Sequence, residues 1–143
     1  METAKWFLAH SKQDGLEEVE QWCAKIGRAL VQDGWKTKVV SGRDDYETRS
    51  AALGGWKAWC HDVPHGKDFQ GSPMFHGVIV PMYSDDTVRT VGKATGQIVQ
   101  GFLSAGKHVY CWCPAQDRFS QIEHVEVLPE DDYLAWARLD FKC

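Results

Sequence analysis

The sequence lacks several patterns that mark common classes of ligand-binding protein. No G-x-G-x-x-G follows its first apolar run, and it contains no G-x-x-x-x-G-K-[ST], so the phosphate cradles of dinucleotide oxidoreductases and P-loop NTPases are missing. Lysine and arginine form no cluster and the net charge is −4. Nucleic-acid binding is driven by phosphate neutralisation, so no nucleic-acid partner is expected. We expect a small ligand or another protein as the partner.

No apolar run approaches the length needed to span a bilayer, and the first ten residues lack the small-residue cleavage site of a secretory signal. We therefore expect a cytoplasmic protein with no membrane partner. The 143 residues, 43% of them hydrophobic, are enough for one globular domain spanning 1–143 and too few for two.

Metal-binding spacings are also missing. The five cysteines include no C-x-x-C, and their only close pair is Cys111 and Cys113, so we predict reduced thiols. His61 and His65 have an i, i+4 spacing that can hold a metal on a helix, but Pro64 between them is expected to break that helix. We predict no metal site and no cofactor.

The chain does contain apolar runs that alternate with amphipathic segments. The apolar runs predict buried strands at 4–9, 35–40, 75–82, 107–112 and 123–128. Apolar residues at helical spacing predict helices from 16 to a stop at 34, at 46–60 with a weak point at its two glycines, and at 90–105, and a final helix opens at 129–132. Two prolines and two glycines predict a loop at 62–74. Such alternation is typical of a parallel sheet covered on both faces.

Ligands of parallel sheets bind beyond the carboxyl ends of the strands. The polar and aromatic residues expected there are predicted to bind the ligand: His10, Ser11, Arg43, Asp44, Asp45, Trp56, Tyr83, Ser84, Thr95, Gly96 and Trp112. Among them Arg43 is a candidate phosphate clamp, because its planar guanidinium matches phosphate oxygens. Trp56 and Trp112 offer aromatic faces on which a base could stack.

The segment from Gly92 to Trp112 combines a glycine-rich helix with the fourth strand. Glycine costs about 1 kcal/mol relative to alanine in a helix interior, so something must approach this backbone closely. Either the exposed amides cradle a phosphate or a ribose hydroxyl, or the glycines let the helix pack tightly on its neighbours. The polar side chains of this helix include Gln97 and Gln100, and the segment contains no carboxylate.

Three short motifs carry a resemblance to known families. The third strand reads F-H-G-V-I-V-P, and the following helix ends in S-A-G-K-H-V-Y-C-W, which resembles the nucleoside 2-deoxyribosyltransferase superfamily. The opening F-L-A-H-S-K-Q-D resembles the start of TIR domains. This resemblance implies a three-layer flavodoxin-like (Rossmann-like) α/β domain with a mostly parallel sheet of four or five strands. It also implies a homo-oligomer in which a neighbour completes the site.

Both families carry a glutamate in the helix before the fourth strand, where this chain offers Gln97 and Gln100. A carboxylate can add to or stabilise an anomeric carbon, whereas an amide is neutral and a poor nucleophile. The resemblance therefore implies a protein that binds and sequesters a small nucleotide, or an NAD- or ADP-ribose-derived signal, without turnover, as an anti-defence protein would.

Two alternatives stay open at this point. One is an active N-ribosyl or deoxyribosyl transferase or hydrolase that draws a replacement acid from Asp44, Asp45, Glu47 or Asp86. The other is a protein-interaction module that docks through the aromatic stretch from Trp56 to Phe69.

Overall fold

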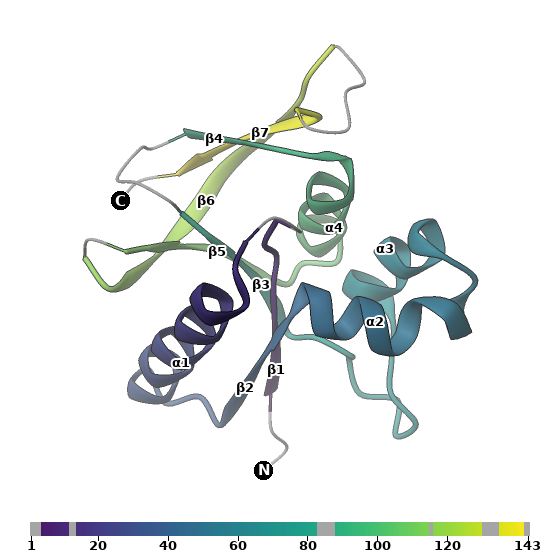
Figure 1. Ribbon diagram of the computed structural model, residues 1–143, viewed down its shortest axis with the longest axis horizontal. Coiled ribbons are helices and arrows are strands. Elements are labelled where there is room, and N and C mark those ends of the chain that lie inside the picture. Colours follow the sequence, from purple (N-terminus) through teal and green to yellow (C-terminus); the bar gives the residue numbers. More distant parts are fainter. Residues whose placement is uncertain (1–3, 12–13, 83–87, 115, 130–134, 142–143) are drawn as a thin grey trace.

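The computed structural model describes residues 4–11, 14–82, 88–114, 116–129 and 135–141. In these ranges seven strands form one mixed sheet in the order β2-β1-β3-β5-β6-β7-β4 (Figure 1). One end is parallel: β2 (Thr37–Ser41), β1 (Ala4–Leu8), β3 (Gly77–Pro81) and β5 (His108–Cys113). The other end is antiparallel: β6 (Arg118–Val127), β7 (Ala137–Phe141) and β4 (Val88–Val91).

This sheet corrects the predicted fold class. A flavodoxin-like domain with a mostly parallel sheet of four or five strands was expected, but three of the six strand pairings are antiparallel. The prediction was wrong because it began a helix at residue 90, inside what is strand β4, and ended the sheet with one short strand. Instead, β6 runs for ten residues and pairs with both β5 and β7. The start of the predicted final helix lies largely outside the described residues, and Ala137–Phe141 is a strand.

The parallel strands have apolar side chains on both faces because each face meets helices. On one face Trp6, Leu8 and Ile79 pack with α1 (Leu16–Gln32). On the other face Phe7 and Val78 contribute to a second core with α3 (Trp56–His65) and α4 (Lys93–Ser104). Partly buried side chains of α2 (Gly42–Leu53) pack against that second core. Helices α2, α3 and α4 thus lie together, away from α1 (Figure 1).

The helix predicted at 46–60 is divided at its weak point, the two glycines, and the segment belongs to two helices. Gly54 and Gly55 have φ of 101° and 119°, in the left-handed region that favours glycine, and they end α2 before α3 begins. The expected break at Pro64 is absent, because α3 continues to His65. Pro64 lies in the last turn, where the missing N–H costs one bond, and its buried ring packs against the bare backbone of Gly101.

The cysteines differ from the prediction at one position. Cys23, Cys60 and Cys111 are free thiols, whereas Cys113 is disulfide-bonded, so the prediction of reduced thiols is wrong for Cys113. Within the described ranges, no helix has the length and apolar character needed to cross a membrane.

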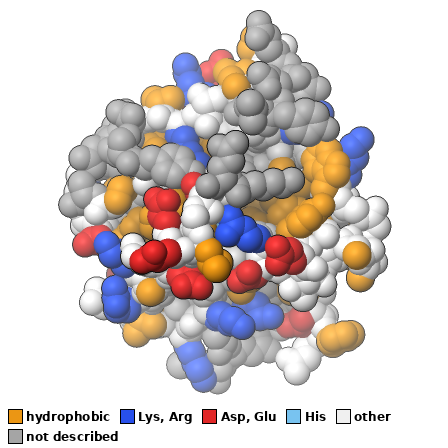
Figure 2. All heavy atoms as spheres, in the orientation of Figure 1, with side chains coloured by type: hydrophobic (Ala, Val, Ile, Leu, Met, Phe, Trp, Pro, Cys, Tyr) orange, Lys and Arg blue, Asp and Glu red, His pale blue; other side chains and the backbone are white. Residues whose placement is uncertain are grey.

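Acidic and basic side chains are interspersed over the face seen in Figure 2 and do not gather by sign. The described part of this face therefore presents mixed charge, in keeping with the small net charge of the whole chain.

Candidate functional site

The carboxyl ends of β1 and β2 bring His10, Ser11 and Arg43 together, as predicted. The His10 side chain is 1% exposed. Its Nε2 accepts a hydrogen bond from the Arg43 backbone N–H at 3.4 Å, which leaves Nδ1 to donate to the Ser11 carbonyl at 2.9 Å. The Arg43 guanidinium donates to the Asp14 carbonyl at 2.6 Å, and the Ser11 N–H donates to the Asp14 carboxylate at 2.8 Å. These contacts hold the turn after β1 against the start of α2.

This arrangement favours a neutral imidazole at His10. Burial lowers the pKa of His10, and the positive charge of Arg43 lowers it further. The Ser11 carbonyl and the Asp14 and Asp44 carboxylates act in the opposite direction, and the pKa remains below its usual value. A protonated ring would also lose the acceptor that receives the Arg43 N–H. His10, just past the carboxyl end of β1, therefore has a structural role as the acceptor of the Arg43 N–H.

A pH dependence of stability follows from His10. Since its folded-state pKa lies below the unfolded value of about 6.5, His10 contributes stability above that pH. The contribution is lost as the pH falls from about 6.5 through the folded-state pKa. His10→Gln removes the titration, so the variant should lose less stability than the wild type between about pH 7.5 and pH 5. Urea unfolding at both values measures this, and equal losses in the two proteins would contradict the assignment.

Asp44 and Asp45, predicted to bind the ligand, lie in the first turn of α2 and have different surroundings. The backbone N–H of Asp44 donates to Ser41 Oγ at 3.1 Å, which caps the helix, and its side chain is exposed. Asp45 is buried and accepts two bonds from Arg49, from Nε and from Nη2, each at 2.9 Å. It also accepts the indole N–H of Trp59 at 2.9 Å. Arg49 further bonds Asp62 on α3. The Asp45 carboxylate therefore joins α2 to α3.

The predicted aromatic residues are not brought to one place. Trp112 is 1% exposed and packs in the core beneath α1. Trp56 is half-buried and packs against the core on the opposite face of the sheet. Tyr83, Ser84 and the candidate acid Asp86 lie outside the described residues, while Glu47 is exposed on α2.

The glycines of α4 are explained by helix packing, the second of the two interpretations of this segment. A Cβ on Gly96 would lie 2.5 Å from the Trp136 ring and 3.2 Å from Ala137 Cβ. A Cβ on Gly101 would lie 2.4 Å from Pro64 Cγ. Gly92 precedes the helix in an extended conformation as its N-cap, and Thr95 is half-buried in the first turn. These glycines therefore let α4 approach α3 on one side and β7 on the other.

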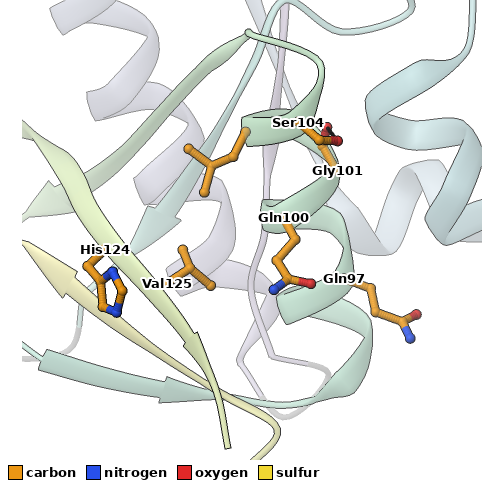
Figure 3. Close-up of a pocket in the computed structure, with 7 residues that line it drawn as sticks. Gln97, Gln100, Gly101, Ser104, His124 and Val125 are labelled. Carbon is orange, nitrogen blue, oxygen red and sulfur yellow. Dashed lines mark hydrogen bonds between the residues drawn. The ribbon is translucent and has the colours of Figure 1, made fainter.

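Gln97 and Gln100 line an open hollow of about 750 Å³ between α4 and β6. Figure 3 shows Gln100 and Val125 on the two sides of this hollow, with Gln97 directed away from Val125. Among the described residues, the lining is Gln97, Gln100, Gly101, Leu103, Ser104, His124 and Val125. These residues offer amides, a hydroxyl and one imidazole beside apolar surface, and none of them is a carboxylate or a thiol.

The β6 side of this hollow was not predicted from the sequence. His124 and Val125 were assigned to the last predicted strand without a position relative to α4. Their position depends on the pairing of β6 with β7. The sequence pattern that could have indicated β7 is the alternation of apolar and charged residues in Ala137–Phe141, whose apolar side chains are buried.

Comparison with protein-family models, with curated proteins and with solved structures gives no match to this chain.

Proposed function

We propose that this chain binds a small nucleotide-like ligand, through its nucleoside part, in the hollow between α4 and β6 and does not turn it over. The proposal is carried by one observation: the two glutamines that stand where the resembling families have a glutamate line this hollow. Primary amides offer both donors and acceptors, as base edges and ribose hydroxyls require. Leu103 and Val125 supply apolar surface for a flat ring.

The chemistry of the lining supports binding without catalysis. Attack on an anomeric carbon, or its stabilisation, uses a carboxylate, and the described residues that line the hollow include none. Ser104 Oγ donates to the Gly101 carbonyl at 3.0 Å, so its proton is held within the helix. Of the candidate replacement acids, Asp45 is committed to Arg49 and Trp59. A protein that binds a signal and leaves it intact suits sequestration, and an anti-defence role is part of the proposal.

Thermal unfolding with a panel of nucleosides, NAD, ADP-ribose and cyclic ADP-ribose nucleotides tests the proposal. A ligand at about 100 times its dissociation constant should stabilise the protein by about 2.7 kcal/mol. Gln100→Ala should weaken binding about tenfold, since it removes a hydrogen-bonding group from the hollow. Gln32→Ala, at the exposed end of α1 under the other face of the sheet, is the matched control and should bind like the wild type.

The same samples decide between the alternatives. Sustained release of free base would contradict binding without turnover and would point to one of the remaining candidate acids, Asp44, Glu47 or Asp86. No stabilisation by any member of the panel would contradict the proposed ligand class.

A protein-interaction role is the second candidate, because one observation favours it. Phe69 is fully exposed at the tip of the loop that leads from α3 to β3. Asp68 Oδ1 accepts the N–H groups of Gln70 and Ser72 at 2.9 and 3.0 Å, and the Met74 N–H bonds the Gly66 carbonyl at 2.9 Å. An aromatic ring on a loop held in this way offers contact area with little entropy left to lose. Of the docking stretch predicted from Trp56 to Phe69, Phe69 is the aromatic residue that is fully exposed, whereas Trp59 is buried.

A further inference from the structure

His61 and His65 lie on the same side of α3, one turn apart. Both side chains are exposed, and their ring centroids are 4.9 Å apart with an interplanar angle of 38°. The helix that joins them is continuous through Pro64, so the i, i+4 spacing is realised in space. Two imidazoles at this spacing on a helix are the arrangement that metal-binding helices use to place two ligands on one ion.

The turn that carries the pair is held by contacts to three other parts of the chain. The Gly66 N–H bonds the Asp62 carbonyl at 2.6 Å and closes the last turn. Lys107 Nζ donates to the Pro64 carbonyl at 2.6 Å, and the Pro64 ring fills the space left by Gly101 on α4. The Asp62 side chain bonds Arg49 of α2. The backbone beneath both histidines is thus fixed before any ion arrives, which lowers the entropy lost on binding.

We propose that His61 and His65 together bind one divalent transition-metal ion of the kind that prefers imidazole nitrogen, such as Zn²⁺, Ni²⁺ or Cu²⁺. Within the described ranges no group of three or more histidine, cysteine or acidic side chains could hold a metal, so the pair supplies two ligands and water completes the shell. Such a site keeps coordination positions open to an outside group. It lies beside Gly101, which also lines the hollow. The proposal does not depend on the nucleotide hypothesis.

Titration of the tag-free full chain with Ni²⁺, followed by calorimetry, tests this site. The wild type should bind one ion per chain at the pair. His61→Ala and His65→Ala should each weaken binding at least tenfold, because a second ligand on the same helix acts at high effective concentration. His124→Ala removes another exposed histidine, on β6, and should leave the Ni²⁺ affinity unchanged.

His61 and His65 are both exposed, so neither substitution should disturb the fold. Circular dichroism and urea unfolding of the ion-free variants check this. Affinity equal to that of the wild type in either variant, or loss of binding in His124→Ala alone, would overturn the proposal.

Discussion

Asp45→Ala is expected to lower the free energy of unfolding by about 3 kcal/mol or more. The substitution leaves the half-buried Arg49 with only Asp62 as its acidic partner and removes the acceptor of the Trp59 indole. Breaking a buried charge pair from one side typically costs about 3–5 kcal/mol, because the remaining charge stays out of water. Urea unfolding monitored by circular dichroism measures the change.

Asp44→Ala is the matched control, one residue earlier in the same helix. Its side chain is exposed, so only a favourable interaction with the start of α2 is lost, at less than about 1 kcal/mol. Asp45→Asn keeps the shape of the side chain and removes its charge. It should lower the free energy of unfolding by most of the amount expected for Asp45→Ala. Equal effects of the Asp44 and Asp45 substitutions would show that the carboxylate does not join α2 to α3.

Gly101→Ala is expected to destabilise the protein by about 1–3 kcal/mol, although alanine is the better helix former. Helix propensity alone predicts a gain of about 1 kcal/mol. The new Cβ would lie 2.4 Å from Pro64 Cγ, however, and a proline ring fused to the backbone of α3 cannot rotate away. Steric overlap should therefore exceed the propensity gain, and thermal or urea unfolding measures the difference.

Gly27→Ala in α1 provides the comparison. There the new Cβ meets only Val39 Cγ2 at 3.9 Å, an ordinary van der Waals contact, so the propensity gain of about 1 kcal/mol should appear as added stability. The same glycine-to-alanine change should thus lower the free energy of unfolding at Gly101 and raise it at Gly27. Two gains, or two losses, would contradict the packing explanation of the α4 glycines.

Asp45→Ala and Gly101→Ala change the stability of the fold, so they do not by themselves test ligand binding. Asp45 was a candidate acid for catalysis, and its carboxylate accepts hydrogen bonds from Arg49 and Trp59. Gly101 contributes to the hollow as well as to the contact with Pro64. Loss of ligand binding in Gly101→Ala would therefore need the unfolding data beside it, whereas Gln100→Ala changes a half-buried side chain of the hollow alone.

The helices and strands with a strong local pattern could be predicted from the sequence. Helix α1 was expected because Val19, Ile26 and Leu30 recur at helical spacing, and all three are buried. The apolar run 75–82 was expected as a buried strand, and β3 is buried along its whole length. These patterns are local because each element buries a continuous stripe or run of its own residues.

The antiparallel half could not be predicted in the same way. Strand β4 has four residues, only one of them buried, and it is held by pairing with β7, far along the chain. The site shows the same limit. Gln97 and Gln100 lie on a helix that the sequence predicts, but the place of Val125 opposite Gln100 depends on the register of β6 against β7. No local pattern encodes such long-range pairing.

The pairing of β4 with β7 also has a consequence for biosynthesis. During synthesis on the ribosome, strand β4 (Val88–Val91) emerges well before strand β7 (Ala137–Phe141). In the described sheet, β7 is the only strand that pairs with β4. Until then the Gly96 side of α4 also lacks Trp136 and Ala137, the residues that cover it. The parallel half can assemble first, while α4 waits with one side uncovered. Completion of the domain, and of the hollow beside α4, therefore has to wait for the synthesis of Ala137–Phe141.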